Sequence, residues 1–202
     1  MCNFLCRCFV FTRRSSNLSQ RSDMRFFLIL LFSGICTVAR SQQVLFTNKA
    51  TVYLVRHGEK ETGADPLLTA EGNARAGDLS RLLKDKNIRR IYVTPYRRTR
   101  NTGDSLRIQS GIDTLHYLAD TSCNDLLEKI RVTGDYNHPI LIIGHSNTIP
   151  LIIRKLGLPN YPADYIPDHE YDNLFVLTYN KGIATLKKMK FGAPSGSSAR
   201  MQ

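Results

Sequence analysis

Three segments rich in histidine, arginine and glycine directly follow apolar, strand-like runs of this 202-residue chain. They are residues 56–59 (RHGE), 94–98 (TPYRR) and 144–148 (GHSNT). In parallel sheets, ligands bind beyond the carboxyl ends of the strands. If the three strands are neighbours, two histidines and two or three arginines meet at one place.

Histidine beside arginine at such a place is suited to phosphoryl transfer. Arg56 and Arg98 would hold phosphate oxygens, because a guanidinium group binds them through two parallel hydrogen bonds and keeps its charge. A neutral imidazole is a competent nucleophile near neutral pH and can form a covalent intermediate. Fixed positive donors stabilise the charge that spreads over the equatorial oxygens in the transition state. Gly58 would let the backbone come close to the ligand.

Each of these residues also has an ordinary structural alternative. His145 taken alone could be a hydrogen-bonded core histidine. Three arginines could lie on the solvent-facing side of a helix, and this is favoured for the last of them: Arg97, Arg98 and Arg100. The remaining histidines lack this context: His116, His138 and His169. The joint pattern favours a site, because each reactive segment follows an apolar strand.

The sequence contains no P-loop, no dinucleotide fingerprint and no metal-ligand cluster, so we expect a site that uses neither a cofactor nor a metal. The run Cys2, Cys6, Cys8 has no histidine or carboxylate cluster beside it. Cys123 is the only cysteine beyond residue 41, so we expect this part of the chain to fold without a disulfide.

Strand-like and helix-like segments alternate from Ala50 onward. The expected strands are 51–55, 90–94, 114–118 and 139–143, with a hairpin of 173–179 and 184–191 around the NKG sequence at 180–182. The expected helices are 70–86, 98–109, 125–132 and 149–156. This alternation predicts an α/β fold with a mostly parallel central sheet, helices on both faces and a C-terminal antiparallel hairpin.

Two further segments are expected to be irregular. Residues 158–171 form a long loop with three prolines and three tyrosines, and loops of this length are usually functional or disordered. We expect the loop to set substrate preference, and we expect a disordered tail over 192–202. The domain itself is expected to span 42–191.

Residues 1–41 are typical of a leader. The stretch 26–39 (FFLILLFSGICTVA) is shorter than the roughly 20 residues of a membrane-spanning helix and fits the apolar part of a signal peptide. We expect the true start at Met24, cleavage near Ser41, and export to the periplasm or outside the cell. Lipidation at Cys36 and an uncleaved membrane anchor are the alternatives.

Almost half of the net charge of +11 lies in this leader. Residues 1–41 hold six basic and one acidic residue, which leaves 22 basic and 16 acidic residues, or +6, in the rest. That charge would steer small anionic substrates. No basic stripe with interleaved aromatic residues occurs, so nucleic acid is not an expected partner.

Four motifs resemble those of the histidine phosphatase superfamily, also called the phosphoglycerate mutase-like fold. They are residues 54–59 (LVRHGE), 68–72 (LTAEG), 94–102 (TPYRRTRNT, similar to SPLxRAxQT) and 144–148 (GHSNT). The resemblance covers about Thr51 to Tyr179 and suggests a compact, exported branch of the family. It implies that His57 takes the phosphoryl group, with Arg56, Arg98 and His145 around it.

The substrate-binding candidates are four residues: Arg56, Arg98, Gly58 and Asn147. Four positions depart from the family pattern: Thr94 for serine, Tyr96 for leucine, Thr99 for alanine and Asn101 for glutamine. These departures leave Arg98 in place, so we expect a preserved pocket with a changed rim.

The resemblance also implies a carboxylic acid that protonates the leaving group. Asp120, directly after the third strand, is the first candidate, and Glu59, beside the nucleophile, is the second. A general acid contributes roughly 10²- to 10⁴-fold in rate, so an enzyme with a poor one acts best on good leaving groups.

The sequence therefore predicts a metal-independent phosphomonoesterase that works through a phosphohistidine on His57. Its partner would be a small phosphorylated substrate or a phosphoprotein, and a membrane would be contacted only through an uncleaved leader. A phosphoglycerate-type mutase is an alternative, although mutases carry more inserted chain. A non-catalytic module that binds phosphate or phosphoproteins is another.

Overall fold

The computed structural model describes Phe46 and residues 49–195. The predicted leader, with Met24, Cys36 and the cleavage position near Ser41, lies outside these residues, as do residues 196–202 of the predicted tail. Among the described residues, no helix combines the length and the apolar character needed to cross a membrane.

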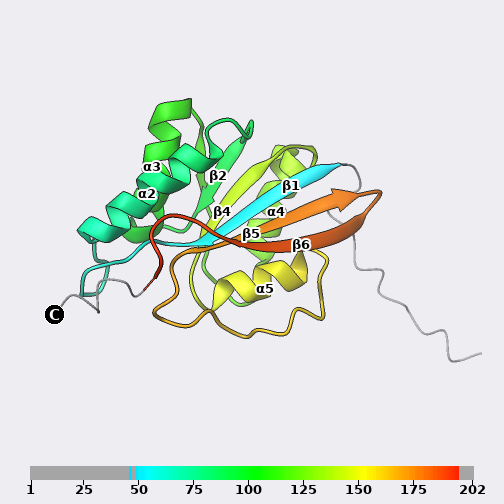
Figure 1. The fold of residues 1–202 in the computed structure, drawn as a ribbon. Helices are drawn as coiled ribbons and strands as arrows, with labels where there is room; N and C mark the ends of the chain where they lie inside the picture. Colours follow the sequence, from blue (N-terminus) through cyan, green and yellow to red (C-terminus); the bar gives the residue numbers. More distant parts are fainter. Residues whose placement is uncertain (1–45, 47–48, 196–202) are drawn as a thin grey trace, which may run out of the picture. The chain divides into compact units, whose positions relative to one another are not determined.

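A mixed sheet lies at the centre of the described residues (Figure 1). Its strands are β1 (Ala50–Arg56), β2 (Arg90–Val93), β3 (Thr114–His116), β4 (Ile140–Gly144), β5 (Asn173–Asn180) and β6 (Ile183–Lys190). Their order is β3-β2-β4-β1-β5-β6. The first four are mutually parallel, whereas β5 runs antiparallel to β1 and β6 runs antiparallel to β5. The predicted fold class, an α/β fold with a mostly parallel sheet and a terminal hairpin, is confirmed.

Helices cover both faces of this sheet. α2 (Ala70–Leu83) and α3 (Arg97–Ser110) pack on one face, and α4 (Asn124–Thr133) and α5 (Thr148–Lys155) pack on the other. Figure 1 shows α2 and α3 side by side, with α5 on the opposite side of the sheet. A short 3-10 helix, Asp135–Asn137, leads into β4.

The central strands bury side chains on both faces, which explains their continuous apolar runs. Leu54 packs in the hydrophobic cluster of α4 and α5, while its neighbour Val55 packs in the cluster of α2 and α3. Ile142 and Ile143 on β4 divide in the same way. Successive strand residues point to opposite faces, so a strand covered on both sides needs apolar residues at almost every position.

Local signals set the ends of these elements. Thr69 begins α2, with its hydroxyl oxygen accepting a hydrogen bond from the Gly72 amide at 3.1 Å. Gly111 ends α3 in the left-handed conformation, at φ 62°. Lys181 and Gly182 connect β5 to β6 with φ values of 51° and 78°. Two positive φ angles are what the tightest type of hairpin turn requires.

The first residues of the predicted disordered tail differ from expectation. Arg75 on α2 donates hydrogen bonds to the carbonyl oxygens of Phe191 and Ala193, at 3.1 and 3.0 Å. The Ser195 hydroxyl oxygen accepts bonds from the amides of Tyr171 and Asp172, at 2.8 and 2.9 Å. The amino-acid composition of the tail could not predict that residues 192–195 are ordered, because their hydrogen-bond partners belong to distant parts of the chain.

Candidate active site

The two motif histidines come together at the carboxyl ends of adjacent strands. β2, β4 and β1 are neighbours, and Arg56 of β1 is in register with Gly144 of β4. The His57 amide donates to the Gly144 carbonyl at 3.0 Å. The ring centroids of His57 and His145 are 5.5 Å apart. The expectation that these strand ends converge is therefore met.

The His57 imidazole is buried and fixed in one tautomer. Its Nδ1 lies 2.8 Å from the Gly58 carbonyl oxygen. A carbonyl can only accept, so Nδ1 carries the proton and Nε2 keeps its lone pair. Burial lowers the pKa of His57 to about 3, and the nearby Arg56 charge also lowers it, although the bond to Gly58 acts in the opposite direction. A neutral ring with a free Nε2 is the form that can attack phosphorus.

The His145 imidazole is held by groups on both of its nitrogens. Its Nδ1 lies 3.4 Å from a terminal nitrogen of Arg98, and its Nε2 lies 3.0 Å from the hydroxyl oxygen of Thr94. A guanidinium group only donates, so Nδ1 accepts and the Nε2 proton points to Thr94. Burial, followed by the charges of Arg98 and Arg56, lowers the pKa of His145 to about 4.

Two of the departures from the family motif support this second histidine. The hydroxyl oxygens of Thr94 and Thr99 are 2.8 Å apart, and the Thr99 hydroxyl lies within 2.9 Å of the Tyr96 carbonyl. Both threonines are fully buried. When Thr94 accepts from His145, its own proton is directed to Thr99, whose proton goes to a carbonyl. The two threonine hydroxyls thus orient the His145 ring.

The lowered histidine pKa values predict a pH-dependent stability. In the unfolded chain both histidines bind protons below about pH 6.5, whereas in the folded chain they stay neutral to about 4 and about 3. Stability should be complete above about pH 6.5 and fall as the pH falls, by on the order of 1 kcal/mol per pH unit for each histidine. Urea denaturation at several pH values between 4.5 and 7 measures this. A His57→Gln, His145→Gln chain should show a flatter dependence, and a flat wild-type profile would contradict the prediction.

Arg56 and Arg98 flank the histidines, and each keeps one buried donor without a partner. Arg56 donates to the carbonyl oxygens of Pro167 and Asp168, both at 3.0 Å. A terminal nitrogen of Arg98 lies 3.9 Å from Asp65. The Nε of each arginine has no hydrogen-bond partner among the described residues. A buried unpaired donor costs about 1–3 kcal/mol, so an anion that accepts from both would be favoured.

The structure gives Gly58 a reason other than ligand approach. A Cβ at this position would lie 3.0 Å from the Gly72 carbonyl oxygen and 3.2 Å from its Cα. The glycine lets the loop after β1 pack directly on α2. Its amide donates to Thr102 on α3 at 2.9 Å. Asn147 is exposed at the N-terminal end of α5, and its side chain makes no capping bond there.

Asp120, the first candidate for the proton donor, has its carboxylate in a local turn. It accepts from the Ser122 hydroxyl at 2.6 Å and from the Cys123 amide at 2.7 Å. These bonds lower the pKa of Asp120 and favour the ionised form, which cannot donate. The structure shows no contact between this carboxylate and either motif histidine. Its position favours a role in starting α4.

Replacing Asp120 with asparagine separates the two roles. Asparagine keeps an oxygen that can accept the turn hydrogen bonds but has no proton to deliver as a carboxylic acid. We expect turnover of alkyl and aryl phosphates to stay within about twofold of wild type, because a missing general acid would cost roughly 10²-fold or more. Steady-state kinetics on both substrate types measures this. A selective loss on the alkyl phosphate would restore Asp120 to the donor role.

Glu59, the second candidate, is paired with Arg75. The two side chains form hydrogen bonds of 2.6 to 3.0 Å, and the Arg75 side chain is 4% exposed. This pair ties the loop after β1 to α2, and Arg75 also holds the carbonyl oxygens of Phe191 and Ala193. The arrangement supports a structural role for Glu59.

Two acids that sequence reasoning missed lie beside the arginines. Asp65 approaches Arg98 and also accepts from the Arg97 amide at 2.9 Å, while Asp168 lies 3.5 Å from Arg56. Both occur in loops whose local sequence carries no motif, so only their spatial neighbours mark them. In the described part of the chain, no cluster of three or more histidine, cysteine or acidic residues could hold a metal ion.

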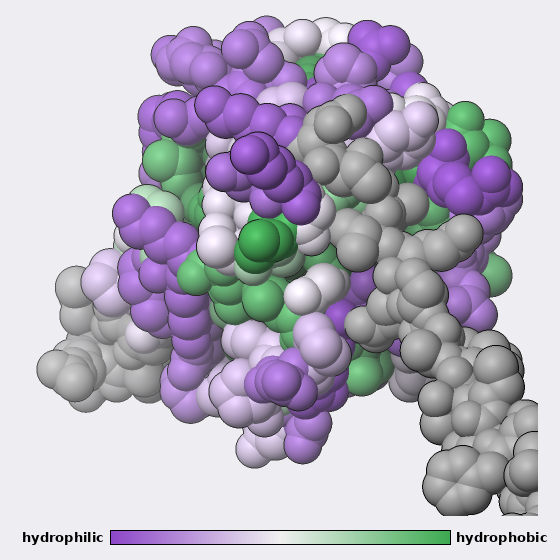
Figure 2. Space-filling view, turned by 90° about the vertical axis from the view of Figure 1, so that its right-hand side faces the viewer, coloured by the Kyte–Doolittle hydropathy of each residue, from purple (hydrophilic) through white to green (hydrophobic). Residues whose placement is uncertain are grey.

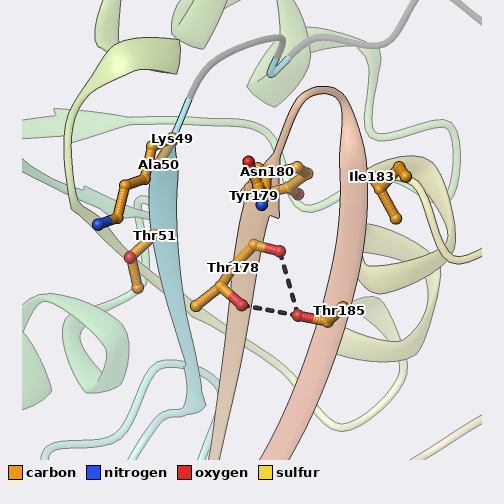
Figure 3. Close-up of a pocket in the computed structure, with 8 residues that line it drawn as sticks. All are labelled: Lys49, Ala50, Thr51, Thr178, Tyr179, Asn180, Ile183 and Thr185. Carbon is orange, nitrogen blue, oxygen red and sulfur yellow. Dashed lines mark hydrogen bonds between the residues drawn. The ribbon is translucent and has the colours of Figure 1, made fainter.

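A pocket of about 550 Å³ lies at the opposite end of the sheet, where β1 begins and β5 ends (Figure 3). The hydroxyl groups of Thr178 and Thr185 line it and bond to each other at 2.7 Å. Figure 2 shows this end as a small hydrophobic area surrounded by hydrophilic residues. Among the described residues that line the pocket, Lys49 alone is charged. The pocket therefore lacks the histidine and arginine side chains that phosphoryl transfer would need.

Comparison with known proteins agrees with this geometry. The family model of the histidine phosphatase superfamily (branch 1) matches residues 52–119. Sequence comparison with curated proteins gives no match. Among solved structures, the chain is similar to a candidate phosphohistidine phosphatase SixA from Agrobacterium tumefaciens, with a TM-score of 0.55 and 22% identity. That match covers 74% of this chain and 100% of the other.

Two further structures share the fold at lower identity. The chain is similar to the alpha-ribazole phosphatase of Shigella flexneri, with a TM-score of 0.53 and 17% identity over 69% of this chain and 96% of the other. It is also similar to the phosphoglycerate mutase of Bacillus anthracis, with a TM-score of 0.52 and 16% identity over 72% and 94% of the two chains. The match to the family model over residues 52–119, together with the shared fold, agrees with the resemblance of the sequence motifs to the histidine phosphatase superfamily.

Proposed function

We propose that this protein is a metal-independent phosphomonoesterase that works through a phosphohistidine on His57. The observation that carries the proposal is a pair of buried, neutral histidines between two arginines that each keep an unpartnered Nε–H. The match of residues 52–119 to the family model supports a phosphatase- or mutase-type activity. The arrangement of these four side chains supports the more specific reaction.

The first step breaks the bond between phosphorus and the ester oxygen. Nε2 of His57 attacks phosphorus and forms a P–N bond, while the electron pair leaves with the oxygen of the departing group. The Nδ1–H of His57 stays bonded to Gly58 and keeps Nε2 aimed. Arg56 and Arg98 stabilise the transferring group through their charge and their free Nε–H donors.

The second step releases phosphate. Water attacks phosphorus, the P–N bond breaks, the electron pair returns to Nε2, and the two protons of the water stay on the released phosphate as H2PO4⁻. His145 lies across the site and offers Nδ1 toward the Arg98 side. Burial, followed by the charges of Arg98 and Arg56, keeps His145 neutral. A bound phosphoryl group offsets those arginine charges, which favours a proton on Nδ1 that can bond to a phosphoryl oxygen.

The proton for the leaving group has no dedicated source in this arrangement. The acids beside the site, Asp65 and Asp168, are paired with arginine charges, and Glu59 is paired with Arg75. We therefore expect turnover to be faster for leaving groups that depart without protonation. Small phosphate esters and phosphoproteins both fit this expectation, and export through the leader stays a prediction.

The direct test is hydrolysis of p-nitrophenyl phosphate by the full chain, with and without EDTA. The proposal predicts phosphate release that EDTA does not change. A mutase would transfer the phosphoryl group to an added acceptor faster than to water. A binding module would retain phosphate esters without releasing phosphate. No release across about pH 4 to 8, together with retention of ester, would overturn the proposal in favour of binding.

A further inference from the structure

Two tyrosines lie against the two arginines of the site in matching ways. The guanidinium carbon of Arg56 lies 4.3 Å from the centre of the Tyr171 ring, and that of Arg98 lies 4.3 Å from the centre of the Tyr96 ring. Each ring also approaches one motif histidine. The Tyr171 and His57 centroids are 6.1 Å apart, and the Tyr96 and His145 centroids are 5.4 Å apart.

The sheet order places these rings on opposite sides of the histidines. Tyr96 follows β2 and Tyr171 precedes β5. Across the sheet, β4 and β1, which carry the motif histidines at their carboxyl ends, lie between β2 and β5. A phosphoryl group on His57 would therefore have an aromatic ring on each flank.

Hydrogen bonds fix the backbone at both tyrosines. The Tyr96 carbonyl accepts from the Thr99 amide at 3.2 Å and from the Thr99 hydroxyl at 2.9 Å, at the start of α3. The Tyr171 amide donates to Ser195 at 2.8 Å. Tyr96 nevertheless remains 40% exposed, so part of its ring surface is available to a ligand. Rigid, partly open rings contribute contact area with little loss of side-chain freedom.

We propose that the site selects substrates whose phosphoryl group is bound directly to a planar aromatic ring, such as a phenol or an imidazole. This proposal rests on the proposed function. Aromatic rings attract one another in stacked or edge-to-face arrangements, beyond the burial of their surface. Tyr96 and Tyr171 supply such partners on the two flanks of the departing group.

The chemistry of the leaving group agrees with this choice. When the P–O bond of an aryl phosphate breaks, the electron pair stays on an oxygen whose charge spreads into the ring. The departing group therefore needs no proton at that moment, and the acids near the site are engaged in ion pairs. An alkyl oxygen cannot spread its charge in this way. Tyr96 stands where the family pattern has leucine, and it is the Tyr96 ring that packs against Arg98.

The test compares phenyl phosphate with hexafluoroisopropyl phosphate, a non-aromatic ester whose alcohol is acidified by fluorine. The full chain is assayed beside Tyr96→Leu and Tyr171→Leu. We expect each substitution to lower kcat/KM for phenyl phosphate by about three- to tenfold, and to change kcat/KM for the fluoroalkyl ester by less than about twofold. The phenylalanine variants should keep the aryl preference, because they keep the ring.

Tyr165→Leu is the matched control. Tyr165 belongs to the same loop as Tyr171 but is 65% exposed, and its replacement should change neither substrate. Phosphoimidazole, assayed in parallel, separates an imidazole-bearing substrate from a phenol-bearing one. Equal losses on the phenyl and fluoroalkyl esters would mean that the tyrosines only shield the arginines, and would overturn this inference. Absence of wild-type turnover on every ester would instead remove the proposed function.

Discussion

A His57→Asn variant is expected to release phosphate from p-nitrophenyl phosphate on the order of 10⁴-fold more slowly than the wild type. Asparagine is similar in size to part of the imidazole ring but has no nucleophilic nitrogen. The neighbouring Arg56 and Arg98 remain, so inorganic phosphate should still bind within about tenfold of its wild-type affinity. Loss of turnover with retained binding is the signature of a removed nucleophile.

The proposed covalent step can be tested directly. Incubation with ³²P-labelled substrate followed by rapid denaturation should leave an acid-labile, base-stable label on the wild type and none on His57→Asn. His116→Asn is the matched control, because His116 is exposed at the end of β3 and lies outside the convergence of β2, β4 and β1. It should keep both label and turnover. Label that persists in His57→Asn but disappears in His145→Asn would assign the nucleophile to His145.

An Arg75→Met variant should unfold about 3 kcal/mol more easily than the wild type, because removal of one partner leaves a largely buried carboxylate unpaired. The Arg75 side chain is 4% exposed, and it bonds to both oxygens of Glu59 and to the carbonyl oxygens of Phe191 and Ala193. Urea denaturation measures the loss. The substitution also releases the 191–195 segment, so proteolysis near the C-terminus should become faster.

Arg81→Met provides the comparison within the same helix. The Arg81 side chain is 68% exposed and pairs with Asp78, so its loss should cost less than about 1 kcal/mol. A similar small change for Arg75→Met would contradict a structural role for the buried pair.

Glu59→Gln then tests the alternative role of the acid. Glutamine keeps one oxygen that can accept from Arg75 but has no acidic proton. If Glu59 is structural, stability falls while the ratio of aryl to alkyl turnover stays constant. A selective fall of alkyl turnover would identify Glu59 as the proton donor, whatever happens to stability.

The elements of the fold could be predicted from local sequence. Thr69 and Gly111 carry side-chain and backbone preferences that begin or end a helix without help from distant residues. Residues 139–143 are apolar at every position, which indicates a strand covered on both faces, and β4 occupies the centre of the sheet. The convergence of the motif histidines could also be predicted, because parallel strands place their carboxyl ends at the same edge of a sheet.

The surroundings of those histidines could not be predicted in this way. Asp120 follows the third strand as expected, yet its carboxylate bonds to Ser122 and Cys123 within its own turn. Asp65 and Asp168 approach the arginines from loops that carry no motif. A side chain in a loop after a strand can point toward the site or away from it, and its spacing from the strand in the sequence does not show which.

Sequence by itself determined which residues could do chemistry and which strand ends would carry them, because residue type and hydrophobic period are local properties. Tertiary structure decided which partners those residues have. Arg75 meets Phe191 across 116 positions of chain, and Arg56 meets the carbonyl of Pro167 across 111. Contacts of such separation depend on the order in which strands pair and on the path of the loops between them. Those choices fix the tautomers, charges and neighbours of the site residues.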